Sequence, residues 1–190
     1  MTAPVQTGDA GPGGSSMLSA AGLLAALRAV MSRELAAVSR SVAAYQDDAS
    51  LWREIPGAPN SGGTLVLHLV GNLRHFVGKG LGGTDYVRDR EAEFRDRGHT
   101  RDELLEMLDI TAREVDSALA IIAPDLLGSE HALPAGGWLV RNDELLLHLA
   151  AHLAYHLGQL DYHRRIATGE RQGVEALPVD ALPSARRLDG

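Results

Sequence analysis

The sequence predicts an all-α protein, a four-helix bundle with long crossover connections. Four segments carry apolar residues at the three- and four-residue spacings of amphipathic helices, and no alternating strand pattern repeats between them. Capping residues, glycines and prolines mark most of their ends. The connections near residues 80–99 and 124–141 each have about 20 residues, more than an antiparallel hairpin needs, so one or more can join parallel neighbours. Simple up-down-up-down order is therefore not expected.

The first predicted helix covers about residues 17–47, and its apolar residues recur on one face. Those apolar residues are Leu23, Leu24, Leu27, Val30, Met31, Leu35 and Val38. The second predicted helix covers about residues 64–79 and follows the loop IPGAPNSGG, in which Asn60 and Ser61 are turn or capping groups. A cluster of glycines ends the second helix.

The third predicted helix runs from Thr100 to about residue 123. Thr100 stands three residues before Glu103, which is the spacing of a capping box. Pro124 prevents the helix from continuing, because proline has no backbone N–H to donate and its ring clashes with the preceding turn. Both ends of this helix are therefore marked in the sequence.

The fourth predicted helix covers about residues 142–168, with Asn142 as its N-cap and Gly169 after its last turn. Four of the chain's eight histidines lie between positions 148 and 163, within this helix. This helix is therefore the richest in histidine of the four.

Outside the bundle, predicted for residues 17–170, the chain has two tails. Residues 1–16 are rich in Gly, Ser, Thr and Pro and predict a disordered N-terminal tail. Residues 171–190 form a C-terminal extension that is expected to be partly disordered. Three apolar residues of this extension can pack against the bundle: Val174, Leu177 and Leu182.

Composition argues against several classes of protein. The chain has 18 Lys and Arg against 25 Asp and Glu, a formal charge of -7, and no dense basic stretch, so nucleic acid is not an expected partner. No apolar run reaches the roughly 18–20 residues of a membrane helix, and the N-terminus lacks the pattern of a signal peptide. We therefore expect a cytoplasmic protein without a membrane partner.

The absence of cysteine limits the chemistry of any metal site. The chain has no disulfide, no thiolate ligand and no cysteine nucleophile. A metal ion would have to be bound by His, Asp or Glu.

The spacing of the histidines suggests one metal site. His152 and His156 are four residues apart, about 6 Å along a helix, so both imidazoles can reach one ion. His148 is about 12 Å from His156 and is too far to share that ion. His68, at the edge of the apolar face of the second helix, is the best third ligand. His75 lies two turns beyond His68, so it can share the groove but not the ion.

Spacing alone leaves the metal site open. A helix with several histidines contains an H-x-x-x-H pair by chance, and such residues also form hydrogen bonds at the edge of a core or remain solvated. For four other histidines we expect an ordinary surface or loop position: His99, His131, His148 and His163.

Three segments resemble the DinB/YfiT-like metalloprotein superfamily. They are LVLHLVGNLRHFVGKGLGG (65–83), YVRDREAEF (86–94) and HLAAHLAYHLGQLDYHRRIATG (148–169). The specific parts are HLVGNLRHF and H-x-x-x-H-x-G-Q, and the resemblance spans the whole folded body. It implies a four-helix bundle, often a homodimer, with a divalent metal ion bound by one histidine of the second helix and two of the last. The corresponding residues here are His68, His152 and His156.

The resemblance leaves the reaction open. Superfamily members of known activity include thiol-dependent S-transferases and a mycothiol-dependent isomerase, whereas many others have no assigned activity. Three imidazoles leave ligand positions for water or substrate, and nitrogen ligands suit zinc, which we favour, or nickel. Such an ion activates either water for hydrolysis or a low-molecular-weight thiol cosubstrate for transfer to a small molecule. The alternative is a non-catalytic, metal-stabilised dimeric binding or stress-response protein.

Four polar residues are candidates for a catalytic role. Asn72 follows His68 by one turn and can orient water or substrate, or it can simply be hydrogen-bonded at a helix interface. Gln159 has the same two interpretations. The charged run VRDREAEFRDR (87–97) can close the mouth of a pocket, contact a second subunit or form a solvated loop. Arg90 and Glu91 are the residues of this run to test first.

Overall fold

The structure is a computed structural model that describes residues 19–175 and 178–188. These residues form six α-helices, four of them long, and include no β-strand. The long helices are α1 (Ala20–Ala43), α3 (Gly62–Leu73), α5 (Arg101–Ile121) and α6 (Asn142–Thr168). The short helices are α2 (Asp48–Leu51), α4 (Arg90–Arg95), the π-helix η1 (Arg74–Lys79), and the 3-10 helices η2 (Pro124–Gly128) and η3 (Val179–Ala181). The predicted all-α class is confirmed. Within the described ranges, no helix combines the length and apolar character that a membrane crossing requires.

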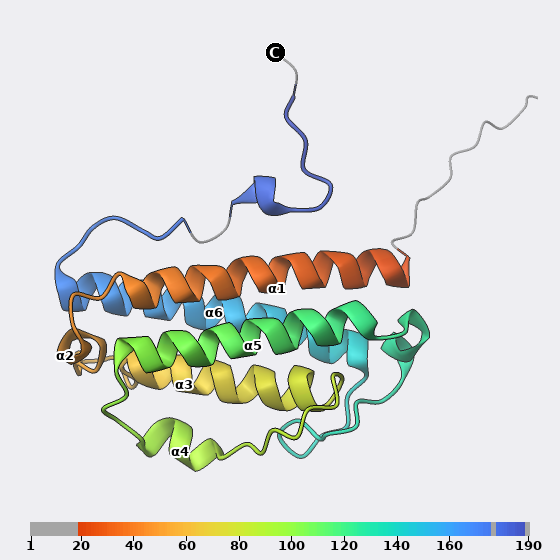
Figure 1. The fold of residues 1–190 in the computed structure, drawn as a ribbon, viewed down its shortest axis with the longest axis horizontal. Helices are drawn as coiled ribbons and strands as arrows, with labels where there is room; N and C mark the ends of the chain where they lie inside the picture. Colours follow the sequence, from red (N-terminus) through yellow and green to blue (C-terminus); the bar gives the residue numbers. More distant parts are fainter. Residues whose placement is uncertain (1–18, 176–177, 189–190) are drawn as a thin grey trace, which may run out of the picture.

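The four long helices form a bundle in which α1 and α3 occupy opposite corners. Each of these two helices packs against both α5 and α6. In Figure 1, α1 and α6 run in one direction, and α3 and α5 run in the other. Because α3 and α5 are parallel neighbours, residues 80–100 return along the length of the bundle and carry α4 with them. The predicted crossover is thus present, whereas the connection from α5 to α6 reverses the chain at one end.

The first helix is shorter than the predicted range 17–47, of which residues 17 and 18 lie outside the described part. It ends at Ala43, and α2 begins four residues after Ala44 with its own capping box. The Asp47 carboxylate accepts a hydrogen bond from the Ser50 backbone, and the Ser50 hydroxyl faces the Asp47 backbone N–H. This local hydrogen bonding competes with a continuous helix and turns the chain toward α3.

The caps of the next two helices agree with the prediction. The Ser61 hydroxyl accepts a hydrogen bond from the first turn of α3. Thr100 and Glu103 form the predicted capping box of α5. The predicted range 64–79 includes a change that apolar spacing does not reveal, because after Leu73 the α-helix widens into the π-helix η1.

The start of α6 differs from the prediction. Asn142 is the first residue of the helix rather than its N-cap, which is Arg141. The Asn142 side chain is buried and donates to the backbone carbonyl of Leu126 in η2, so its amide links two elements instead of capping. The end is as predicted, since Gly169 has a φ of 78° after the last turn.

His163 is a buried side chain of α6, so its predicted surface or loop position is wrong. Its Nε2 donates to the backbone carbonyl of Arg53, and its Nδ1 accepts from the Tyr45 hydroxyl at 2.7 Å. Burial lowers the pKa of His163, because the charged ring would lose its hydration, although the hydrogen bond to the Arg53 backbone opposes this effect. The buried face of α6 thus extends to its last turns, where Tyr45 and the Arg53 carbonyl form the hydrogen bonds of the His163 ring.

His131 lies in a loop, as predicted, but it is buried rather than on the surface. Its Nε2 donates to the backbone carbonyl of Phe76 at 2.9 Å, and its Nδ1 accepts from the Leu133 backbone. The imidazole therefore ties the loop before α6 to the π-helix. The remaining two histidines of that group agree with the prediction, His99 in a loop and His148 exposed on α6.

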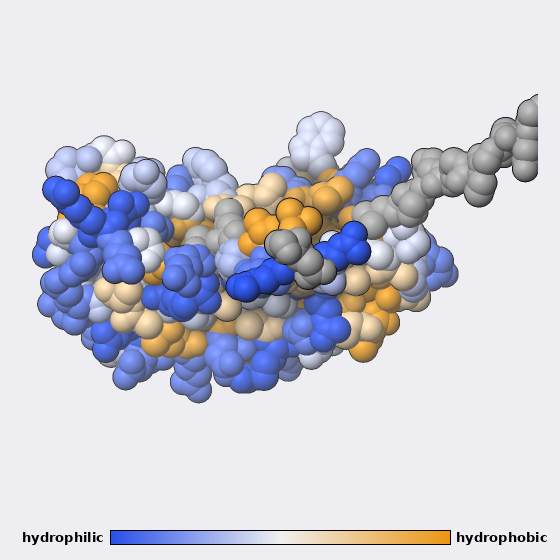
Figure 2. Space-filling view, turned by 90° about the horizontal axis from the view of Figure 1, so that it is seen from above, coloured by the Kyte–Doolittle hydropathy of each residue, from blue (hydrophilic) through white to orange (hydrophobic). Residues whose placement is uncertain are grey.

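The described part of the C-terminal extension runs back along α1 (Figure 1). Arg40 donates to the backbone carbonyl of Val174, and Arg33 donates to that of Pro178. Val174 and Leu182 are partly buried, as expected, whereas Leu177 and the predicted tail at 1–16 lie outside the described residues. Hydrophilic residues cover most of this face, and apolar residues form separate patches (Figure 2).

The hydrogen bond between Tyr45 and His163 gives a test of the core. We expect Tyr45→Phe to lower the free energy of unfolding by about 1–3 kcal/mol, because the buried Nδ1 of His163 loses its donor. Urea denaturation at pH 7.5 measures the change. The exposed Tyr155 of α6 provides the control, and Tyr155→Phe should change stability by less than about 0.5 kcal/mol. Equal effects of the two variants would contradict the importance of this hydrogen bond.

Candidate metal centre

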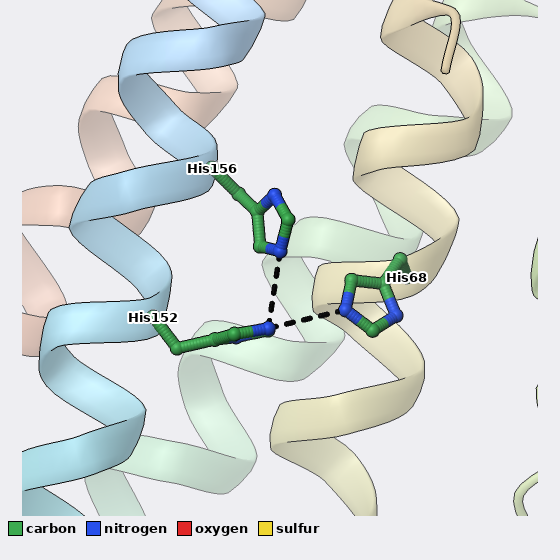
Figure 3. A group of neighbouring side chains, drawn as sticks. All are labelled: His68, His152 and His156. Atoms are coloured by element: carbon green, nitrogen blue, oxygen red, sulfur yellow. Dashed lines mark hydrogen bonds between the residues drawn. The ribbon is translucent and has the colours of Figure 1, made fainter. Parts of the chain in front are cut away.

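Helices α3 and α6 bring three histidines together (Figure 3). The Nε2 atom of His152 lies 3.2 Å from Nε2 of His68 and 3.0 Å from Nε2 of His156. One ligand atom from each residue falls within 4.8 Å of the other two. His68 is buried, and the other two are partly buried. The antiparallel packing of the two helices thus places the i, i+4 pair of α6 opposite the single histidine of α3.

Hydrogen bonds on the far side of two rings fix their tautomers. His68 Nδ1 lies 3.0 Å from a Glu93 carboxylate oxygen, and His156 Nδ1 lies 2.7 Å from the Gln159 amide oxygen. Both oxygens accept, so both Nδ1 atoms carry hydrogen and both Nε2 atoms of the neutral rings present lone pairs. His152 Nε2 faces both lone pairs but can donate only one hydrogen. At least one of the two contacts therefore has no hydrogen of its own between the nitrogens, and a cation held by all three Nε2 atoms would satisfy them together.

The protonation states also suit a metal ion. Burial, together with the neighbouring histidines, lowers the pKa of His152 to about 4. Burial also lowers the pKa of His156, although the hydrogen bond to Gln159 opposes this effect. Both imidazoles are therefore neutral near pH 7, as metal ligation requires. The donor set, the tautomers and the protonation states all fit a divalent ion.

Glu93 is a candidate functional residue that the sequence analysis missed. It lies in α4 and is buried, and its carboxylate contacts His68 Nδ1 and the Arg88 guanidinium. The two Arg88 hydrogen bonds measure 2.6 and 2.9 Å. Burial raises the pKa of Glu93, but the hydrogen bonds from Arg88 and His68 outweigh it, and the pKa is lowered. A metal-ligating histidine commonly donates its other N–H to a carboxylate, which is the arrangement found here.

Gly71 makes room for that carboxylate. A Cβ atom at position 71 would overlap the Glu93 side chain. The glycine, three residues after His68, faces α4 across a contact that has no space for a methyl group. In the sequence, Gly71 stands out as a glycine within an apolar helix and so indicates a close contact at this position. The sequence does not show which acidic residue of the charged run makes that contact.

A cavity of about 720 Å³ opens beside the histidines. His68 and His152 line one end of it, and Asn72 lines its wall. Asn72 is buried, and its Oδ1 has no hydrogen-bond partner among the described residues. Arg90 also lines this cavity and is exposed.

The remaining predicted candidates lie elsewhere. Glu91 is exposed and does not line the cavity, whereas Glu93, two residues later, contacts His68. Gln159 lies outside the cavity and contacts His156 instead. His75 and His148 line the cavity away from the three converging nitrogens, in agreement with the spacing argument.

Comparison with known families gives one match. A family model described as Mycothiol-S-transferase matches residues 26–169, from within α1 to the end of α6. The chain belongs to the Mycothiol-S-transferase family. This match also confirms the resemblance to the DinB/YfiT-like superfamily. Searches of curated proteins and of solved structures gave no significant match.

Membership of the Mycothiol-S-transferase family points to thiol transfer for proteins of this kind. The matched range contains the three converging histidines together with Glu93 and Gln159. The described centre is therefore part of the region that the family shares.

The contact between Gly71 and Glu93 gives a test of this centre. We expect Gly71→Ala to lower the free energy of unfolding by about 1–3 kcal/mol, because the methyl group overlaps the buried carboxylate. Urea denaturation measures the loss, which should shrink in a Glu93→Ala background. Gly158→Ala is the matched control, because a Cβ at this position of α6 has nothing within 4 Å. A similar loss in both glycine variants would show that the Glu93 contact does not matter.

Proposed function

We propose that this protein is a metal-dependent S-transferase that joins a low-molecular-weight thiol, mycothiol by family, to a small-molecule electrophile. The convergence of three imidazole Nε2 atoms at one end of a cavity supports this proposal most directly. Three nitrogen ligands leave positions for a substrate, and they suit zinc best, with nickel as the second choice. The chain has no cysteine, so the reacting sulfur has to come from the cosubstrate.

His68, His152 and His156 would hold the ion through Nε2. Such an ion would lower the pKa of a thiol held beside it. In the transfer, the sulfur would form a bond to carbon, the thiol proton would go to solvent, and the broken carbon–halogen or epoxide carbon–oxygen bond would leave its electron pair on the halide or the oxygen. Glu93 and Gln159 keep hydrogen on the Nδ1 atoms and so hold the Nε2 lone pairs toward the centre. Asn72 offers its unpaired amide oxygen to substrate in the cavity.

The same centre leaves a hydrolase as the second candidate, with water in place of the thiol. The family match favours transfer over hydrolysis. A purely structural ion is less consistent with a donor set of only three side chains beside a large cavity. We retain the homodimer, the cytoplasmic location and the bundle domain at 17–170 as parts of the proposal.

Metal content tests the ligands. We expect His68→Ala, and the double variant His152→Ala with His156→Ala, to lose the bound ion in elemental analysis. Glu93→Gln should keep the ion but bind it about 10–100-fold more weakly in a chelator competition, because His68 loses its charged partner. His148→Ala, whose imidazole lies outside the cluster, is the control and should bind as tightly as the wild type. Unchanged metal content in His68→Ala would refute the site.

Thiol consumption tests the reaction. Metal-loaded protein should consume mycothiol in the presence of a haloarene or an epoxide, and removal of the ion by a chelator should stop this while circular dichroism still shows a folded bundle. Bacillithiol and glutathione serve as comparison thiols. Failure to consume any of the three thiols would reject the transferase, and conversion of a substrate without thiol loss would favour the hydrolase. Unfolding on metal removal would favour a structural ion.

A further inference from the structure

Another cavity, of about 270 Å³, lies between α6 and the loop at residues 55–60, with Leu65 of α3 in its wall, on the other side of the histidine cluster. Along α3, Leu65 lines this small cavity and Asn72 lines the large one, with His68 between them. Along the antiparallel α6, Ile166 lines the small cavity and His148 lines the large one. Both helices therefore give the same order, and the cluster separates the two cavities.

The two cavities differ in chemistry. The large cavity has Asn72, His75 and Arg90 on its walls, and buried polar atoms of the first two have no hydrogen-bond partner among the described residues. A ligand rich in hydroxyl groups would satisfy such atoms. The walls of the small cavity are mainly apolar, and they include Tyr162 and Ile166, residues that are 65% and 61% exposed. Exposed apolar groups around a hollow favour an apolar ligand.

Gln159 connects the small cavity to the cluster. Its side chain lines that cavity, and its amide oxygen accepts the hydrogen bond from His156 Nδ1. Tyr162 lies six residues beyond His156, which corresponds to about 9 Å along the helix axis. A group that extends from the cluster past His156 therefore has to be several carbon atoms long before it meets Tyr162.

We propose that the two cavities bind the two halves of the transfer product. The large cavity takes the sugar-bearing body of the thiol, the sulfur lies at the histidine cluster, and the small cavity takes an aliphatic chain of the electrophile. The inference rests on the proposed function, and it adds a substrate class: electrophiles that carry an alkyl chain of several carbons.

Binding of product analogues tests this assignment without turnover. The probes are S-methyl, S-butyl and S-octyl conjugates of mycothiol, titrated calorimetrically into metal-loaded protein. We expect the octyl conjugate to bind at least roughly tenfold more tightly than the methyl conjugate, because several methylene groups leave water. In Ile166→Asn with Tyr162→Asn, this preference should fall below about threefold while affinity for the methyl conjugate is unchanged.

Two further variants complete the test. Ile121→Asn changes a similarly exposed isoleucine at the end of α5, outside both cavities, and should keep the octyl preference. Asn72→Ala should weaken the binding of the methyl and octyl conjugates by a similar factor, since Asn72 contacts the thiol half that both conjugates share. Absence of binding by all conjugates, absence of an octyl preference in the wild type, or its survival in the Ile166 and Tyr162 variant would overturn the assignment.

The outcome separates this inference from the proposed reaction. If thiol is consumed but chain length has no effect on binding, the cavity assignment fails and the transferase stands. If no thiol is consumed but the octyl preference is present and is lost in the Ile166 and Tyr162 variant, the cavity assignment stands and the transferase fails.

Discussion

Three imidazole nitrogens face one another between α3 and α6, and neutral imidazoles at this spacing repel unless a proton or an ion lies between them. The hydrogen bonds of His68 to Glu93 and of His156 to Gln159 maintain this situation, because they prevent either ring from turning its N–H inward. His152 completes the cluster without a partner for its own Nδ1 among the described residues. The bundle thus holds the Nε2 atoms of His68 and His156 toward His152 Nε2, in an arrangement that one hydrogen on His152 satisfies only in part and a cation would satisfy fully.

The crossover connection is what makes this arrangement possible. A short hairpin after α3 would have no chain to bring an acid to His68, whereas the return of residues 80–100 along the bundle places α4 beside α3. Glu93 reaches the imidazole there, and Arg88 neutralises its charge, so a buried carboxylate is tolerated beside the core. The crossover connection is therefore what places a charged carboxylate beside His68.

The sequence predicted the bundle, most helix ends and the pair His152 and His156, because periodicity and capping are local and the i, i+4 geometry is rigid. The family resemblance supported His68 as the third member of the cluster. It did not predict the role of Glu93, since which acid of a charged run meets α3 depends on where a six-residue helix comes to lie. His163 and His131 were misplaced for a related reason. Their burial depends on partners distant in the chain, Tyr45 and Phe76, that no local pattern identifies.

The histidine cluster and both cavities lie along α3 and α6, and these two helices also contribute side chains to the apolar core. On α3, Leu69 and Leu73 are fully buried, whereas Asn72 faces the large cavity. Adjacent positions of one helix thus serve stability and ligand contact separately. Evolution can therefore replace the residues that meet substrate, and so change what the protein accepts, while the side chains that hold the bundle together remain as they are.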